Sequence, residues 1–253
     1  MRAGAAAFLV LVAACTARPP RDHRPAVPRA EVQINVCSTP DQIVGALGLG
    51  AAGLTEVWYF DDRSLDLFQR GLVFRLRITR GKPELTMKVA DQDCAIVPGA
   101  LIPRPGGKCE YDLHGDDLRG AVSISTPLDD GTGGELIAGR LPLAQVLSDA
   151  QRRYLKEAVH SWPLTESTEP LGPVYVDAYR GVGKPFVVES WRLPSGRRFA
   201  EISRKVALHE AWRTRAELMD ELAGSGVRAC EDQSSQARAK FVELVSAREV
   251  HGR

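Results

Sequence analysis

Residues 71–89, GLVFRLRITRGKPELTMKV, contain the pattern that decides the fold. Two runs of alternating residues flank the turn RGKP at 80–83, and this arrangement predicts a pair of antiparallel strands. Arg75 and Arg77 share one face of the first run, and Lys88 lies on the polar face of the second. The opposite faces are apolar, with Phe74, Leu76 and Ile78 in the first run and Leu85, Met87 and Val89 in the second. What the charged face contacts therefore decides what the protein does.

The same alternation recurs elsewhere in the chain. Residues 31–36, EVQINV, place Glu31, Gln33 and Asn35 on one face, and residues 197–206, RRFAEISRKV, place Glu201, Ser203 and Lys205 together. Glu110 and Asp112 share a side in KCEYDLHG, although DLHGDD equally suits a polar turn. Further strands are predicted at 55–62, 172–181 and 184–194, and helices at 41–48, 133–162 (broken at Pro142), 207–226 and 234–250.

Strands, a helical insertion, more strands and then helices predict an α+β fold with an antiparallel sheet. Two architectures give such a sheet one polar face. In an open sheet the polar face contacts water, which is the commoner case. In a closed β-barrel with helices packed outside, the polar face lines the interior, which then holds water or a ligand. Periodicity alone favours the open sheet, with Arg75 and Arg77 exposed to solvent.

The amino terminus predicts export. Residues 3–14 form an apolar stretch after Arg2, shorter than the roughly 20 residues of a membrane-spanning helix but typical of a secretory signal. The run Val12–Ala13–Ala14–Cys15 resembles the lipobox of bacterial lipoproteins, in which the cysteine becomes the lipidated first residue. We therefore predict a lipoprotein signal peptide at 1–14, lipidation of Cys15, a Pro/Arg-rich tether at 15–30 and a folded domain at 31–253. The alternative is an ordinary cleaved signal with a chance cysteine.

The net charge and the cysteines limit which partners and which covalent links we expect. The net charge of +1 gives no global attraction to nucleic acid or membranes, so we expect no nucleic-acid partner, and any anion site must be local. Four cysteines follow Cys15, and export favours disulfides. Cys94 and Cys109 bracket a Pro/Gly-rich connection, which predicts that they pair with each other and leaves Cys37 to pair with Cys230. Buried free thiols are the alternative, and the absence of a CxxC pair makes zinc unfavourable.

Residues 57–89 resemble the early part of the CYTH domain family, the triphosphate tunnel metalloenzymes. Tyr59, Phe60 and Asp61 match its YFD-like triplet, followed by a GxALRxR-like strand and an LTxK-like strand. Those two strands carry Gly71, Arg75 and Arg77, and then Leu85, Thr86 and Lys88. The likeness continues in order over most of residues 31–228 but is thin in the middle.

This resemblance implies an eight-stranded antiparallel barrel, or tunnel, with helices outside, in which cations bind a phosphate chain and carboxylates bind Mg or Mn beside it. Arginine offers a bidentate fork and lysine a point charge to closely spaced phosphoryl groups. The implied phosphate-binding residues are Arg75, Arg77, Lys88 and Lys205. The implied metal ligands are Glu31, Glu110, Asp112 and Glu201, with Glu31 and Glu201 as the catalytic pair.

The chain departs from the family pattern where the metal would bind. The opening ExExK motif maps to Glu31, Gln33 and Asn35, which keeps one carboxylate and loses the lysine, and Ser203 replaces the acidic partner of Glu201. Neutral ligands weaken the hold on a hard cation. We therefore expect an envelope lipoprotein, outside the cytoplasmic membrane, that binds triphosphate or polyphosphate with weak or lost hydrolysis. The alternatives are an active metal-dependent triphosphatase and a non-catalytic scaffold at the envelope.

Other catalytic motifs find no support in the sequence. Lys184 in GVGKP lacks the spacing of a phosphate-binding loop and is predicted to lie in a hairpin turn. The histidines lack HExxH spacing, and no GxSxG elbow occurs.

Overall fold

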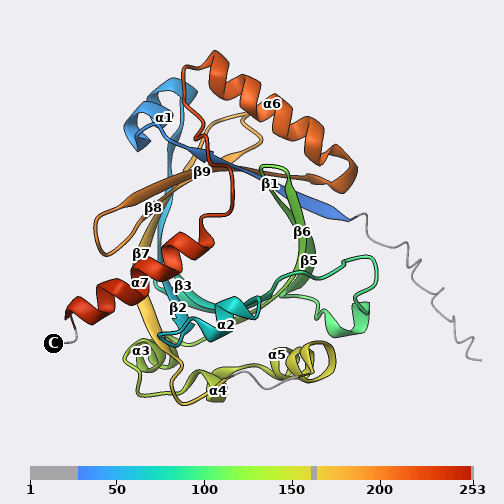
Figure 1. Cartoon of the computed structure of the whole chain (residues 1–253), viewed down its shortest axis with the longest axis vertical. Helices are drawn as coiled ribbons and strands as arrows, with labels where there is room; N and C mark the ends of the chain where they lie inside the picture. Colours follow the sequence, from blue (N-terminus) through green and yellow to red (C-terminus); the bar gives the residue numbers. More distant parts are fainter. Residues whose placement is uncertain (1–27, 161–163, 252–253) are drawn as a thin grey trace, which may run out of the picture.

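Nine strands close into a β-barrel in the computed structural model, which describes residues 28–160 and 164–251. Figure 1 looks along this barrel, with helices packed around it. The strands are β1 (Arg29–Val36), β2 (Gly50–Asp61), β3 (Leu72–Thr79), β4 (Lys82–Val89), β5 (Gly107–His114), β6 (Asp117–Pro127), β7 (Glu169–Arg180), β8 (Val187–Arg192) and β9 (Arg198–Ala207). The predicted α+β barrel with external helices is confirmed.

The strand number and direction correct the expectation of eight antiparallel strands. Around the barrel the order is β1-β5-β6-β4-β3-β2-β7-β8-β9, and β9 pairs with β1 to close it. The strand that the sequence analysis does not single out is β6. Because directions cannot alternate all the way around a ring with an odd number of members, one neighbouring pair must be parallel. That pair is β1 and β5.

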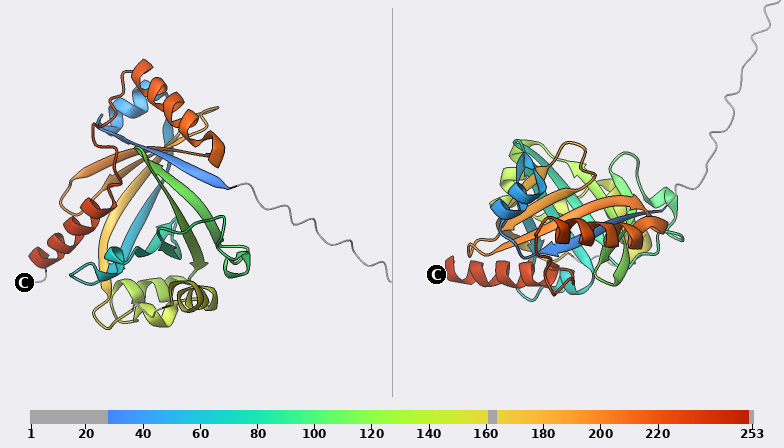
Figure 2. Two further views of the ribbon diagram at one scale, coloured as in Figure 1. Left: turned by 45° about the vertical axis from the view of Figure 1, so that its right-hand side comes forward. Right: turned by 90° about the horizontal axis from the view of Figure 1, so that it is seen from above.

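Two helical layers cover the outer wall. One apolar cluster joins the outer residues of β1, β8 and β9 to α1 (Pro40–Leu47) and α6 (Ala211–Gly224). A second joins β2, β3, β4 and β6 to α3 (Asp130–Ile137), α4 (Leu143–Val146) and α5 (Asp149–Tyr154), which continues into one π-helical turn at Leu155–Val159. The two layers lie on opposite sides of the barrel, as the views in Figures 1 and 2 show. Burial of apolar side chains on the outside leaves the polar faces of the strands for the interior.

The remaining two helices lie over one end of the barrel. They are α2 (Asp66–Gln69) and α7 (Ala237–His251), and Figure 1 shows α7 over the left edge and α2 over the lower edge of the ring of strands. A third apolar cluster contains Phe241 and Leu244 of α7 with Val57, Tyr59 and Trp191 of the strands. Phe241 lies 4.8 Å from Tyr59 and 4.7 Å from Phe68 of α2 between ring centroids. This end of the barrel is therefore packed with apolar and aromatic side chains.

Both predicted disulfides are confirmed: Cys94 pairs with Cys109 and Cys37 pairs with Cys230. Lys184 lies in the connection between β7 and β8, where its N–H bonds to the carbonyl of Gly181, as the predicted hairpin turn requires. The predicted signal peptide, Cys15 and nearly all of the tether lie outside the described residues. Among the residues described, no helix is both long and apolar enough to span a membrane.

Candidate functional site

The cations of β3 face the barrel interior. In β3 the alternate residues Phe74 and Leu76 are fully buried in the outer cluster under α3–α5. Since neighbouring residues of a strand point to opposite faces, Arg75 and Arg77 point inward. Their partners across the β2 pairing, Tyr59 opposite Arg75 and Val57 opposite Arg77, belong to the cluster at the α7 end.

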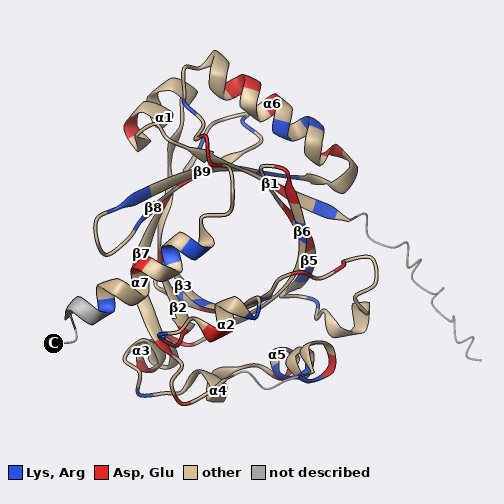
Figure 3. Ribbon diagram, viewed as in Figure 1, with Lys and Arg blue, Asp and Glu red and all other residues tan. Residues whose placement is uncertain are grey.

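Strand register places every predicted site residue on this inner face. Glu31 lies opposite Lys205 on one side and Asp112 on the other, and Asn35 lies opposite Glu201. Their neighbours Val32, Ile34 and Ile202 are fully buried in the outer cluster. Figure 3 shows charged positions around the whole barrel wall and on α7. The inward set comprises Glu31, Arg75, Arg77, Lys88, Glu110, Asp112, Glu201 and Lys205, and the structure thus brings together residues from five strands.

Most of the inward carboxylates are paired with lysines. Lys205 Nζ lies 3.3 Å from Glu31 and 2.9 Å from Glu110, and Glu110 also pairs with Lys108. Lys88 of β4 pairs with Asp112 of β5 across the intervening strand β6, which requires both side chains to project into the interior. Burial opposes the charge of Lys205, but the carboxylates of Glu31 and Glu110 outweigh it and raise its pKa.

Arg75 and Arg77 lack such partners. Within the described ranges neither guanidinium forms an ion pair, and the Nε of each is buried without a hydrogen-bond partner. Burial, reinforced by the charge of Arg77, lowers the pKa of Arg75 to about 10. An unpaired guanidinium in a low-dielectric interior is costly, and an anion bound beside it would remove that cost.

Glu201 is the carboxylate held in the least favourable surroundings. Burial raises its pKa to about 7, with Lys240 acting against the shift and Glu189 adding to it. Glu189 lies directly opposite Glu201 in the pairing of β8 with β9. No ion pair engages either carboxylate in the part of the chain that the structure describes, so Glu201 is partly protonated near neutral pH.

Sequence reasoning missed three charged residues of the interior. Glu189 and Lys108 lie at inner positions of β8 and β5, and strand alternation around Trp191 and Glu110 could have placed them. Lys240 is different, because it enters from α7 and helix periodicity gives no sign that this helix packs over a barrel end. Asn35, treated as a lost lysine, has a structural role: its side-chain amide donates to the carbonyls of Asp232 and Ser234 at 3.0 and 2.8 Å.

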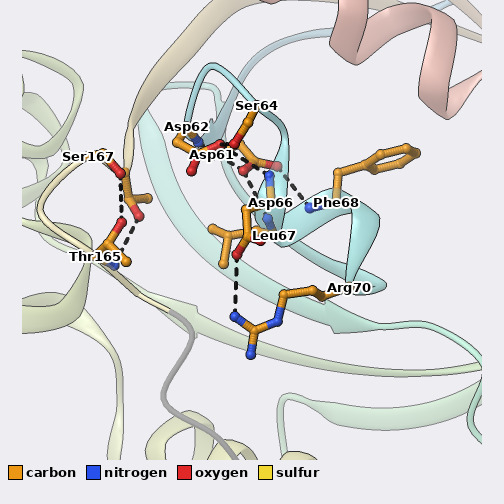
Figure 4. A network of polar contacts seen from close by, with 10 residues as sticks. Asp61, Asp62, Ser64, Asp66, Leu67, Phe68, Arg70, Thr165 and Ser167 are labelled. Atoms are coloured by element: carbon orange, nitrogen blue, oxygen red, sulfur yellow. Dashed lines mark hydrogen bonds and ion pairs between the residues drawn. The ribbon is translucent and has the colours of Figure 1, made fainter.

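Asp61, the last residue of the YFD-like triplet, binds the backbone at the start of helix α2. The carboxylate of Asp61 accepts hydrogen bonds from the backbone N–H groups of Asp62, Leu67 and Phe68 at 2.8, 3.0 and 2.9 Å (Figure 4). These bonds hold the single turn of α2 against the end of β2. Gly71, the motif glycine that follows, adopts φ +72°, a conformation that glycine tolerates best.

The donor set does not fit a divalent metal ion. Among the described residues no three His, Cys, Asp or Glu side chains are placed to hold one. Glu31, Glu110 and Asp112 are occupied by ammonium groups, and the raised pKa of Glu201 reduces the negative charge that a hard cation needs. The described interior therefore holds cations beside three lysine-paired carboxylates and two unpaired ones, an arrangement that does not fit a divalent metal ion.

Comparison with known proteins gives a fold and no sequence family. No family model matches the chain, and no curated protein matches it. Among solved structures, it is similar to a candidate adenylyl cyclase from Hippeastrum that is reported to have a dominant triphosphatase activity. That likeness has 17% identity and a TM-score of 0.58, and covers 83% of this chain and 94% of the other. It is also similar to a candidate adenylate cyclase from Bacillus halodurans, at 11% identity and a TM-score of 0.54, over 83% and 97% of the two chains. These likenesses show that the chain has the barrel fold of those proteins.

Proposed function

We propose that this protein binds a linear phosphate chain, such as triphosphate or the end of a polyphosphate, inside its barrel. Arg75 and Arg77 are the primary phosphate ligands, and Lys88 and Lys205 add charge from β4 and β9. The observation that carries this proposal is the pair of guanidinium groups on the inner face of β3, which form no ion pair within the described residues and whose Nε atoms are buried without a hydrogen-bond partner. Guanidinium groups bind phosphoryl oxygens through charge-assisted, bidentate hydrogen bonds.

The ion pairs around the two arginines support a ligand of several charges. Lys88 and Lys205 pair with carboxylates, and an incoming phosphate chain competes for the same ammonium groups. A single phosphate would satisfy Arg75 or Arg77 only, whereas a chain of phosphoryl units contacts cations on several strands. We therefore expect affinity to increase from phosphate to pyrophosphate to tripolyphosphate.

Calorimetry with sodium tripolyphosphate in EDTA-containing buffer tests this function. We expect binding by wild type without metal, and an affinity at least about tenfold weaker for Arg75→Met, since a hydrogen bond to a charged group contributes about 1.5–3 kcal/mol. Arg198→Met is the matched control, because Arg198 lies on β9, is exposed and occupies an outward position. Absence of binding heat with wild type, or equal loss in both variants, would contradict the proposal.

Hydrolysis is a second candidate function, and the reported triphosphatase activity of the Hippeastrum protein favours it. Against it stand the lysine-paired carboxylates and the neutral side chains of Gln33, Asn35 and Ser203 on the inner face. We propose that hydrolysis is weak or lost. Phosphate release from tripolyphosphate with Mn²⁺ decides the matter: sustained release that Glu201→Ala abolishes would establish the enzyme instead.

We also propose that the protein is a lipoprotein of the cell envelope, anchored through Cys15 with the barrel outside the cytoplasmic membrane. The two disulfides support an oxidising compartment. Metabolic labelling with an alkyne fatty acid tests the anchor. Wild type should incorporate the label and partition with membranes, and Cys15→Ser should do neither; a labelled Cys15→Ser protein would refute the assignment.

A further inference from the structure

The segment that leads into α7, residues 230–236, is attached to the carboxyl-terminal end of β1. Cys230 forms the disulfide with Cys37, and its N–H bonds to the carbonyl of Asn35 at 2.9 Å. The Asn35 side chain binds two carbonyls of the segment, and the side chain of Gln233 binds the N–H and the carbonyl of Asn35 at 2.9 and 3.0 Å. Six polar and covalent links of this kind fix where α7 begins.

This attachment brings Lys240 into the barrel end. Lys240 is 8% exposed, and its ammonium lies 3.9 Å from the ring centroid of Trp191, an inward residue of β8. The next residue, Phe241, is packed between Tyr59 and Phe68. Burial lowers the pKa of Lys240; the carboxylates of Glu201 and Glu189 oppose this shift, and Arg75 and Arg77 add to it. The ammonium thus belongs to the same electrostatic neighbourhood as the two guanidinium groups.

Lys240 shares its lack of a charged partner with Arg75 and Arg77. Its ammonium contacts aromatic rings and forms no ion pair with any described residue. The other inward lysines differ, because Lys88, Lys108 and Lys205 all pair with carboxylates. Buried Lys240 and half-buried Arg75 and Arg77 repel one another, and the carboxylates in their neighbourhood are Glu189 and Glu201. Such an arrangement is costly without an anion and is relieved by one.

We propose that Lys240 of α7 is a third unpaired phosphate ligand, which binds the terminal phosphoryl group of a chain that Arg75 and Arg77 hold. This inference rests on the proposed function and deepens it. Because α2 and α7 pack against one end of the barrel, we place the entry of the chain at the opposite end. There the side chains of Lys205 and Lys108 are 40% and 49% exposed. The preferred ligand is therefore a linear polyphosphate with a free end, and a cyclic trimetaphosphate lacks the terminal group that Lys240 binds.

The test is calorimetry of wild type and three variants with tripolyphosphate and with cyclic trimetaphosphate. For Lys240→Met we expect tripolyphosphate affinity about tenfold weaker or more, for Lys240→Arg an affinity within about threefold of wild type, and no preference for the linear ligand in Lys240→Met. Arg238→Met is the matched control and should bind as wild type does. Arg238 lies on the same helix, is exposed and forms no ion pair within the described residues.

The outcomes separate this inference from the proposed function. If wild type binds tripolyphosphate, Arg75→Met does not, and Lys240→Met binds as wild type does, the function stands and the role of Lys240 is refuted. If wild type binds no phosphate chain, both are refuted. Should Lys240→Met fail to fold, NMR of ¹³C-lysine wild type replaces it, since the chain has only seven lysines. The Lys240 Cε signal is assigned by its loss in Lys240→Arg. During a tripolyphosphate titration its chemical shift should change, with the same midpoint as the binding measured by calorimetry. A signal that does not move while tripolyphosphate binds would overturn the proposal.

Discussion

Arg75 combines a functional role with a cost to stability. The Nε of its guanidinium is buried without a hydrogen-bond partner among the described residues, and the charges of Arg77 and Lys240 act on the same interior. Replacement by methionine keeps the length of the apolar stem and removes the charge. We therefore predict that Arg75→Met increases the free energy of unfolding, by about 1 kcal/mol or more, while it weakens tripolyphosphate binding.

Urea unfolding of the ligand-free protein measures the stability change. Arg198→Met supplies the comparison, because loss of an exposed cation changes stability by no more than about 0.5 kcal/mol. A ligand-free Arg75→Met protein that is less stable than wild type would mean that the guanidinium already has a stabilising partner, and the interior would then need no anion.

The raised pKa of Glu201 predicts that the free energy of unfolding depends on pH. Its pKa rises from 4.5 to about 7 on folding because it is buried. The folded state therefore binds more protons than the unfolded state between these values, and the contribution of Glu201 to stability is lost as pH rises through about 7. Relative to wild type, Glu201→Gln should gain about 2 kcal/mol of unfolding free energy between pH 5 and pH 8. Paired urea titrations at the two pH values check this, and a constant difference would contradict the raised pKa.

The individual residues of the inner face were predictable in part. Strand alternation and the family resemblance together identify Arg75, Arg77 and Lys88, because all three lie in one hairpin whose other face is apolar. Whether that face meets water or an interior is a property of barrel closure, which no local pattern encodes. Lys240 could not be found at all, since its burial depends on a helix that contacts strands far away in the sequence.

At the scale of elements, α2 depends on one buried carboxylate. A four-residue helix gains little stability from its own backbone hydrogen bonds. The Asp61 carboxylate therefore fixes the position of α2, because it binds the N–H groups of Leu67 and Phe68 in the helix and that of Asp62 before it. We predict that Asp61→Ala lowers the unfolding free energy by about 2–3 kcal/mol. Asp66→Ala is the control within α2, because Asp66 pairs only at the surface, with Arg70. Equal losses in the two variants, measured by urea unfolding, would argue against the cap.

Strand β6 explains why the strand count was wrong. Its central inner residues Ala121 and Ser123 are small and uncharged, so beyond Asp117 and Arg119 β6 lacks the charged alternation that marks β1, β3 and β9. The Glu110–Asp112 segment is part of strand β5, not a polar turn, because β6 pairs along its whole length. The helical insertion and both carboxyl-terminal helices follow the predicted segments closely, since their amphipathic patterns are local.

Close backbone approach makes β6 sensitive to substitution. A Cβ at Gly120 would come within 1.8 Å of the carbonyl oxygen of Gln92. Because this oxygen belongs to the backbone, the clash can be relieved only if the backbone of Gln92 or of β6 moves. The Gly120 carbonyl also accepts the N–H of Gln92 at 2.9 Å. We predict that Gly120→Ala destabilises the protein by about 2 kcal/mol or more, measured by thermal unfolding. Gly134→Ala, where nothing lies within 4 Å of the added Cβ, should be nearly neutral or stabilising.

At the scale of the whole molecule, the barrel separates two kinds of burial. The outer wall buries apolar side chains under helices on both sides, and this part of the fold supplies the stability. The interior holds charges whose pairing is incomplete, and it carries the function that we propose. A marginally stable domain tolerates unpaired interior charge only when the rest of the fold compensates for it. The chain shares this barrel fold with the Hippeastrum protein at 17% identity.

The two disulfides differ in what they tie together, and this difference gives a final prediction. Cys94–Cys109 closes a loop of 15 residues, whereas Cys37–Cys230 joins the ends of a segment spanning 193 residues. In the chain-entropy model, their removal costs about 3 and about 5 kcal/mol respectively. The double variant Cys37→Ser/Cys230→Ser should also lose hydrogen-exchange protection in α7 before the strands do, because the links at Asn35 and Cys230 hold that helix over the barrel.

Hydrogen exchange of the two double variants distinguishes a local from a global effect. The Cys94→Ser/Cys109→Ser protein should lose protection around residues 91–107 and keep it in α7. If α7 exchanges at the wild-type rate without Cys37–Cys230, the Asn35 and Gln233 hydrogen bonds hold the helix alone. Tripolyphosphate should then slow exchange in α7 of both variants equally. If instead α7 opens in the Cys37→Ser/Cys230→Ser protein, the tripolyphosphate affinity of this variant should fall toward that of Lys240→Met. A displaced helix removes from the interior the same ammonium group that the substitution removes.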